Sequence, residues 1–238
     1  MKLKDRVAIV TGGGSGIGAA SAIAFAAEGA RVMVVDLDET GAKRTVEAIE
    51  KAGGRAVALT GDVTTAAANK AAVERAMTLW SRLDVFFANA GVPQWKTNVE
   101  DVEEELFDKI MAVNVKGVFL AAKYAMPVMK KARRGVFLVT ASTAALRPRP
   151  GGQVYAASKG AVVTFTKGLA LEGAPYGVRV VALAPVATFT PMLATFMNKR
   201  EVDEEGLAAY IATVPLGGST SRRIWPAPRS SSPRTMRR

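Results

Sequence analysis

The 238-residue chain contains no cysteine and no histidine. Disulfide bonds, thiolate or histidine metal sites, Ser-His-Asp triads and Cys-His pairs are therefore excluded from its chemistry. Proton transfer has to rely on tyrosine, lysine, aspartate or glutamate side chains. We accordingly expect an activity that needs no metal centre.

Long apolar runs are also missing, since no stretch reaches the ~18 residues that a membrane span requires. Residues 1–5 lead straight into a strand-like segment, without the pattern of a secretory signal. Hydrophobic residues make up 49% and charged residues 22% of the sequence, which at this length is typical of one globular α/β domain. The sequence therefore predicts a cytoplasmic protein without a membrane partner.

Acidic residues are few, 21 against 32 lysines and arginines, and the formal net charge is +11. Six of the arginines and no acidic residue lie in residues 217–238, which leaves 26 basic against 21 acidic residues elsewhere. The excess charge is therefore largely a property of the C-terminal end. Since the remaining sequence has no basic stripe interleaved with aromatic residues, we expect no nucleic-acid partner.

An apolar run, a glycine-rich turn and an alanine-rich helical stretch follow one another in residues 6–28. Glycines in residues 12–18 let the backbone approach a diphosphate, and the first amides of the helix point toward its negative charge. A second apolar run ends in Asp36, 18 residues beyond Gly18. A carboxylate there can bind both ribose hydroxyls of NAD and repel the 2′-phosphate of NADP. Alternatively, Asp36 only begins a turn.

Apolar runs and helical stretches continue to alternate up to residue 183. The expected strands cover residues 6–11, 31–36, 55–60, 84–88, 135–141 and 178–183. The expected helices end near residues 28, 52, 82, 131 and 173, and the helix that starts at residue 98 is interrupted near Pro127. Short connections between such elements predict a three-layer α/β domain with a doubly wound parallel sheet, whose ligand crevice lies at the carboxyl ends of the strands.

Asn114 lies near the middle of the helical stretch 98–131, among apolar residues. A polar side chain in such a place holds a backbone kink or a water molecule, or has an ordinary structural role. The stretch has enough apolar positions for two buried faces, one against the sheet and one against a partner subunit.

Tyr155 and Lys159 are four residues apart, so they lie on one face of the expected helix. A phenol, with an ordinary pKa near ~10, becomes an effective acid or base when a fixed cation stabilises the phenolate. Ser142 follows an apolar strand, which places its hydroxyl at the crevice. The trio could move a proton to or from an alcohol oxygen. The spacing alone also fits an aromatic residue and a solvated lysine on a helix surface.

Six motifs in this order resemble the short-chain dehydrogenase/reductase family, in particular its 3-oxoacyl-ACP reductase-like members. They are Thr11-Gly-x-x-x-Gly16-x-Gly18, Asp62-Val63, Asn89-Ala-Gly91, Asn114, Ser142 and Tyr155-x-x-x-Lys159. The resemblance extends from residue 5 to about residue 217. It implies a Rossmann fold and an NAD(H)-dependent oxidoreductase that interconverts a small secondary alcohol and a ketone.

The resemblance also implies roles for individual residues. Tyr155 would exchange the proton with the substrate, Lys159 would lower the pKa of Tyr155 and hold the nicotinamide ribose, Ser142 would bind the substrate oxygen, and Asn114 would keep a water on the proton path. The implied cofactor contacts are Gly12, Ser15, Ile17 and Gly18 at the glycine turn, Asp36 at the adenosine ribose, Asp62 and Val63 at the adenine, Asn89, Ala90 and Gly91 at the second ribose together with Tyr155 and Lys159, and Thr188 and Thr190 near the carboxamide and the phosphates.

The sequence departs from the family pattern at three places. Ala88 replaces the first residue of the usual Asn-Asn-Ala-Gly. Val186 follows Pro185 where a glycine is usual, and valine does not adopt a positive φ without strain. The segment that begins there, residues 186–214, is expected to form a lid over the substrate.

The third departure is the Arg-, Ser- and Pro-rich tail of residues 218–238, which cannot bury a core face. It stands where the family has a further helix and a last strand. A frameshift near codon 217 would explain it, and an authentic basic tail that recruits an acidic partner is the alternative. Without the last strand the sixth strand becomes an exposed edge. We therefore expect a domain of residues 1–217 that forms a homodimer through its long helices rather than a tetramer.

Two other functions remain compatible with the sequence. A folded dinucleotide-binding protein could bind the cofactor without turnover, and a nucleic-acid-associated module could depend on the Arg-rich tail. The sequence does not select a substrate among 3-oxoacyl thioesters, sugars, steroids and other small alcohols or ketones.

Overall fold

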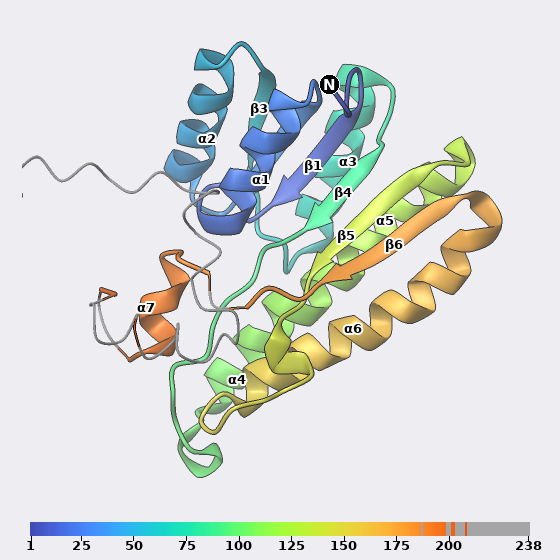
Figure 1. Cartoon of the computed structure of the whole chain (residues 1–238). Coiled ribbons are helices and arrows are strands. Elements are labelled where there is room, and N and C mark those ends of the chain that lie inside the picture. The colour runs from blue at the N-terminus through green and yellow to red at the C-terminus, as the bar shows by residue number, and fades with distance from the viewer. Residues whose placement is uncertain (187, 199–200, 203–207, 209–238) are drawn as a thin grey trace, which may run out of the picture.

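A parallel sheet with helices on both faces forms the body of the protein (Figure 1). The computed structural model describes residues 1–186, 188–198, 201–202 and 208. Within these residues the sheet has six strands in the order β3-β2-β1-β4-β5-β6, all paired in parallel. The strands are β1 (Val7–Thr11), β2 (Arg31–Asp36), β3 (Arg55–Thr60), β4 (Val85–Ala88), β5 (Gly135–Thr140) and β6 (Val178–Leu183). The predicted doubly wound α/β fold is confirmed.

Burial follows the position of each strand in the sheet. Every residue of β1 and β4 is buried, because helices cover both faces of the central strands. The edge strands β3 and β6 have one buried residue each, and their other residues are partly buried or exposed. Val181 and Leu183 of β6 remain 39% and 40% exposed, as expected for a strand at the edge of the described sheet. The tail of residues 218–238 lies outside the described residues.

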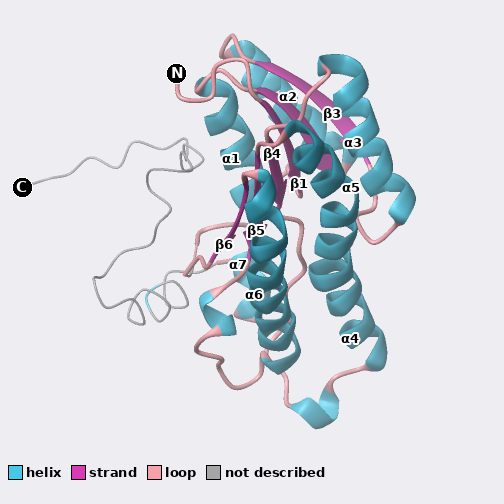
Figure 2. Cartoon of the chain, turned by 90° about the vertical axis from the view of Figure 1, so that its right-hand side faces the viewer, coloured by secondary structure: helices cyan, strands magenta, loops and turns pink. Residues whose placement is uncertain are grey.

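Seven α-helices of the described residues surround the sheet. They are α1 (Gly16–Ala27), α2 (Glu39–Lys51), α3 (Ala66–Trp80), α4 (Glu104–Met111), α5 (Gly117–Ala132), α6 (Gln153–Gly173) and α7 (Met192–Phe196). One core cluster joins α1 and α2 to one face of the sheet, and a second joins α3, α5 and α6 to the other face (Figure 2). Along β1, Ala8 and Val10 belong to the first cluster and Val7 and Ile9 to the second. Successive side chains therefore point to opposite faces of the sheet, as they do in any β-strand.

The long helical stretch is interrupted at Asn114 rather than near Pro127, so that prediction is wrong. A π-helical turn, Ala112–Lys116, separates α4 from α5, and α5 runs continuously through Pro127. A proline inside a helix removes one hydrogen bond and disturbs the carbonyl four residues earlier. The carbonyl concerned is that of Lys123, and both Lys123 and Pro127 lie on the exposed face of α5. Water can bind this carbonyl there, so the packing of the opposite, buried face is enough to keep the helix continuous.

In the part of the chain that the structure describes, no helix combines the length and the apolar character needed to cross a membrane.

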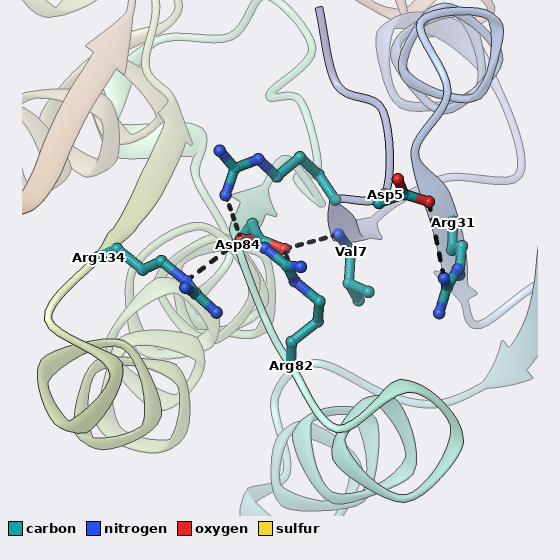
Figure 3. A network of polar contacts seen from close by, with 7 residues as sticks. Asp5, Val7, Arg31, Arg82, Asp84 and Arg134 are labelled. Atoms are coloured by element: carbon teal, nitrogen blue, oxygen red, sulfur yellow. Dashed lines mark hydrogen bonds and ion pairs between the residues drawn. The ribbon is translucent and has the colours of Figure 1, made fainter.

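The amino ends of β1, β4 and β5 are tied together by Asp84 (Figure 3). Its side chain, 6% exposed, accepts hydrogen bonds from the Val7 amide at 2.9 Å, from Arg6 at 3.0 Å and twice from Arg82 at 2.7 Å. The Nε atom of Arg134 lies 3.7 Å from the Asp84 Oδ1 atom and forms a further ion pair. Burial by itself would raise the pKa of Asp84, but the hydrogen bonds from Arg82, Val7 and Arg6 outweigh it and lower that pKa.

We expect Asp84→Asn to lower the free energy of unfolding by about 2–4 kcal/mol at pH 7, because three guanidinium groups lose their carboxylate. A lowered pKa in the folded state contributes stability that is complete above the ordinary pKa, 3.8, and disappears as the pH falls through the folded value. Urea unfolding at pH 7 and pH 3 should therefore show a difference that shrinks in acid. Asp5→Asn is the control, since the exposed pair of Asp5 with Arg31 spans 3.9 Å and contributes little. Equal effects of the two substitutions would contradict the expectation.

Candidate active site

The glycine-rich turn after β1 folds closely against the segment after β4. Gly12 has a φ of +62°, and a Cβ atom there would lie 2.8 Å from the Ala90 Cα. A Cβ atom at Gly18 would lie 2.0 Å from the Gly12 carbonyl oxygen. Both positions therefore require glycine. Ser15, which is exposed, directly precedes α1, so that the amino end of this helix begins at the turn. Ile17, in the first turn of α1, packs against the core on this face.

Asn89 fastens this turn to two strands. Its amide group donates to the carbonyls of Thr11 at 3.1 Å and Gly12 at 3.3 Å, while its oxygen accepts from the Thr140 hydroxyl at 2.9 Å. The Thr11 hydroxyl in turn accepts from the backbone amides of Asn89 and Ala90. The predicted site residues Asn89 and Ala90 thus lie beside Gly12, and the side chain of Asn89 holds the edge of the sheet together.

Asp36 ends β2 with its carboxylate directed at the glycine turn. One oxygen accepts from the Gly14 amide at 2.8 Å and the other from the Asp38 amide at 3.0 Å. The two interpretations of Asp36 are therefore compatible, because it both begins a turn and stands beside the glycines. The Gly61 amide donates to the Asp36 carbonyl at 2.9 Å. This bond brings the next pair, Asp62 and Val63, to the same edge.

Asn114 is fully buried in the π-helical turn. Its side chain accepts from the Val92 amide at 2.8 Å and donates to the Val92 carbonyl at 3.0 Å. The side chain thus binds both backbone groups of Val92, which in a sheet would pair with a neighbouring strand. It also donates to the Ser158 hydroxyl at 3.1 Å. Of the alternatives left open by the sequence, the backbone irregularity is therefore observed, and the side chain links the segment after β4 to α6.

Lys159 is buried, 3% exposed, and its ammonium group donates to the Thr140 carbonyl at 2.8 Å. Its nitrogen lies 5.7 Å from the centre of the Tyr155 ring. The interpretation of a solvated lysine on a helix surface is therefore wrong. Removal from water disfavours the charged form, so burial lowers the pKa of Lys159 from 10.5 to about 8.

Ser142 follows β5 and begins a short 3-10 turn, Thr143–Ala145, that packs against α6. Its hydroxyl oxygen accepts from the Ala144 amide at 3.1 Å. Ser142 is half-buried, like Tyr155. The strand end and the helix thus bring the predicted trio to one side of the sheet edge.

The part of the expected lid that the structure describes packs against Tyr155. The rings of Phe196 in α7 and Tyr155 are steeply inclined to each other, at 70°, and their centres lie 5.0 Å apart. Two residues further on, the Asn198 side chain accepts from the Lys96 amide at 2.7 Å and donates to the Lys96 carbonyl at 2.9 Å. These contacts hold the segment against the loop after β4.

The beginning of this segment also meets the glycine turn. A Cβ atom at Gly16 would lie 3.3 Å from the Thr190 side chain, and the Thr188 hydroxyl donates to the Val186 carbonyl at 3.0 Å. Val186 is not among the described residues with positive φ. The strain expected from valine in place of glycine is therefore absent at Val186.

Several side chains that shape the site were not identified from the sequence. They are Gln94, Thr140, Ser158 and Phe196. Ser158 directly precedes Lys159, and Thr140 stands two residues before Ser142, so both could have been proposed by position. The contacts of Gln94 and Phe196 join distant parts of the chain and leave no local signal.

A doubly wound sheet with a tight glycine turn and a buried lysine beside a tyrosine defines an α/β protein of the dinucleotide-binding type. The sequence profile of the family described as short chain dehydrogenase matches residues 6–201. The chain belongs to this family.

Relatives with names and solved structures agree with this assignment. A 4-formylbenzenesulfonate dehydrogenase of Comamonas testosteroni is 39% identical over 220 residues, 92% of this chain and 87% of the relative. A cyclopentanol dehydrogenase of Comamonas sp. (strain NCIMB 9872) is 37% identical over 191 residues, 80% of this chain and 76% of the relative. The structure of a 3-ketoacyl-(acyl-carrier-protein) reductase from Brucella melitensis complexed with NADH has 41% identity and a TM-score of 0.84, and the match covers 92% of this chain and 86% of that one. The chain is accordingly an oxidoreductase.

We expect Lys159→Met to raise the free energy of unfolding at pH 7 by about 2 kcal/mol. A pKa lowered from 10.5 to about 8 corresponds to a penalty of about 3 kcal/mol for the buried charge, from which the lost hydrogen bond to Thr140 subtracts about 1 kcal/mol. The penalty is complete below pH 8 and fades between pH 8 and 10.5, because the unfolded chain alone stays protonated there. Chemical unfolding at pH 7 and pH 10 measures both effects.

The matched control for this stability measurement is Lys167→Met, at an exposed position of the same helix. It should leave the unfolding midpoint unchanged at both pH values. A Lys159→Met protein that is less stable than the wild type throughout would show that the buried ammonium group stabilises the fold.

Proposed function

We propose that this chain interconverts secondary alcohols and ketones with NAD(H), and that Tyr155 transfers the proton. The observation that carries the proposal is the buried ammonium group of Lys159, 5.7 Å from the centre of the Tyr155 ring. A positive charge so close to a phenol favours the phenolate. With a pKa of about 8, Lys159 is mostly charged at pH 7.

Ser142 and Asn114 complete the proposed machinery. Ser142 would hold the substrate oxygen that exchanges a proton with Tyr155, since its hydroxyl stands at the end of β5. Asn114 would keep the water through which protons reach Lys159. In support, a Cβ atom at Gly91 would lie 3.2 Å from the Asn114 oxygen and 3.4 Å from the Lys159 nitrogen, so these two groups border the same small space.

The residues at the carboxyl edge of the sheet fit a nicotinamide dinucleotide. Gly12 and Gly18 sit where any Cβ atom would clash, and the first amides of α1 begin beside them. When bound, the cofactor supplies or accepts the hydride. The diphosphate would lie against Gly12, Ser15, Ile17 and Gly18, the adenine against Asp62 and Val63, the nicotinamide ribose against Asn89, Ala90, Gly91, Tyr155 and Lys159, and the carboxamide near Thr188 and Thr190. The Brucella melitensis reductase, solved with NADH, supports the same chemistry.

Asp36 supports NAD rather than NADP. Its carboxylate faces the glycine turn and accepts from the Gly14 amide. The negative charge of Asp36 would therefore lie next to the hydroxyls of a ribose held beside that turn. A 2′-phosphate would meet that charge at close range, and like charges at such distances repel by an energy that solvent screens only in part.

The substrate class that we propose is a small cyclic alcohol or ketone. The two Comamonas relatives are named for ring compounds, 4-formylbenzenesulfonate and cyclopentanol. The ring of Phe196 lies beside Tyr155 and provides an apolar wall, which suits a flat, apolar ring.

A groove between α5 and α6 supports the predicted homodimer. It has a volume of about 410 Å³, and its walls include Phe119, Met126 and Phe165. Phe119 is 47% exposed, and a second copy of this chain would cover these side chains. The domain boundary at residue 217 and the cytoplasmic location stay predictions.

A protein that binds the cofactor without turnover is not favoured. Asn114, Ser142, Tyr155 and Lys159 are all present, and neither these four residues nor Val186 are among the described residues with positive φ. The relatives reported above are named as enzymes.

We expect Tyr155→Phe to lower kcat by roughly 10³-fold, because the proton donor is lost, while the affinity for NADH stays unchanged. Reduction of cyclopentanone and oxidation of cyclopentanol, followed by NADH absorbance, measure the first effect, and a fluorescence titration measures the second. Tyr176→Phe, at an exposed position, should behave as the wild type. Full activity of Tyr155→Phe would rule out the proposed mechanism.

We expect Asp36→Asn to improve the affinity for NADPH by about tenfold or more relative to NADH, because the charge opposite the 2′-phosphate is removed. Parallel titrations of both nucleotides give the ratio. Asp38→Asn changes an exposed neighbour, whereas the Gly14 amide donates to Asp36, and should leave the ratio unaltered. A wild-type protein that already prefers NADPH would refute the cofactor assignment.

A further inference from the structure

The helix that carries Tyr155 begins without a cap of its own. Its N-cap residue is Gly152, which has no side chain, and α6 starts at Gln153. The second and third amides of the helix, those of Val154 and Tyr155, therefore need an acceptor from elsewhere.

Gln94, from the loop after β4, supplies that acceptor. Its side-chain oxygen accepts from the Val154 amide and from the Tyr155 amide, both at 3.0 Å. Since both partners are donors, the oxygen and not the amide nitrogen of Gln94 must face the helix. Gln94 is 1% exposed, so water does not compete for these amides.

The carbonyl of Tyr155 is held as well. It accepts from the Ser158 hydroxyl at 2.7 Å, and Ser158 accepts from Asn114 at 3.1 Å. Asn114 binds both backbone groups of Val92, two residues before Gln94. Both backbone groups of Tyr155 are thus connected by side chains to the same short segment after β4.

The amide nitrogen of the Gln94 side chain, unlike its oxygen, is buried without a hydrogen-bond partner among the described residues. A buried donor that is left unpaired is unfavourable for folding. An apolar side chain would avoid this penalty but would leave the two helix amides unpaired. The presence of glutamine is therefore explained by its oxygen.

We propose that Gln94 is a positioning residue for the reaction: it fixes the amino end of α6 and with it the place of the Tyr155 phenol relative to Ser142 and the substrate oxygen. This inference rests on the proposed function. Proton transfer needs donor and acceptor within hydrogen-bond distance, and a small displacement of a reacting group reduces the rate far more than the affinity.

The test compares Gln94→Met, which keeps the length and volume but removes the oxygen, with Gln94→Glu, which keeps an acceptor for the two amides. We expect Gln94→Met to lower kcat by roughly 10- to 100-fold, with KM and the NADH dissociation constant within about twofold of the wild type. Gln94→Glu should recover most of kcat. Wild-type kcat in Gln94→Met, or equal losses in the two variants, would overturn the proposal.

Gln153→Leu is the matched control. Gln153 is the first residue of α6, and its side chain donates to the Thr97 carbonyl at 3.3 Å, so it joins the same helix end to the same loop without binding the Tyr155 amide. Its kcat should equal that of the wild type. A loss as large as that of Gln94→Met would show that general loosening of the helix end is responsible and would overturn the proposal.

Two further measurements separate the possible failures. If Gln94→Met does not fold, Gln94→Asn replaces it, since the shorter side chain cannot reach both amides; wild-type kcat there overturns the proposal, and a selective loss of kcat supports it. Tyr155→Phe in the same assay tests the proposed function by itself. An active Tyr155→Phe refutes that function, whereas an inactive Tyr155→Phe together with a fully active Gln94→Met refutes only the role of Gln94.

Discussion

The ammonium group of Lys159 lies where water is excluded, and the surrounding residues are arranged around this one charge. β5 has to end with the Thr140 carbonyl turned toward α6, because that carbonyl accepts from the buried nitrogen. A Cβ atom at Gly91 would lie 3.4 Å from the nitrogen and only 3.2 Å from the Asn114 oxygen, so a side chain there would crowd the space that these two groups border. Burial keeps the pKa of Lys159 near 8. A lysine in water would hold its proton more firmly and would be free to turn away from Tyr155.

The π-helical turn at Asn114 is a second feature of the fold that is linked to the site. An α-helix of uniform geometry would pair its backbone groups internally and leave little reason for a buried amide side chain. The turn allows Asn114 to bind both backbone groups of Val92, so a side chain takes the place of a neighbouring strand. Irregular turns of this kind are frequent at functional sites. In this chain, the irregularity joins the sheet edge to the helix that carries Tyr155.

Features that depend on neighbouring residues could be predicted from the sequence, and those that depend on distant contacts could not. Central strands such as β1 are buried on both faces and therefore read as unbroken apolar runs. The shared helix face of Tyr155 and Lys159 follows from a spacing of four. By contrast, Gln94 caps a helix that begins 59 residues later, and no local pattern marks it. The error at Pro127 has the same origin, because only the packing of α5 shows that its carbonyl partner faces water.

The two ends of β1 are held by different side chains. Asp84 binds the amide of Val7 at the first residue, and Asn89 binds the carbonyl of Thr11 at the last, roughly 13 Å away along the strand. Groups so far apart that share no partner make independent contributions to the free energy. The arginine cluster around Asp84 can therefore vary during evolution, and adjust the melting temperature, without altering the geometry at the opposite edge where Tyr155 and Lys159 lie.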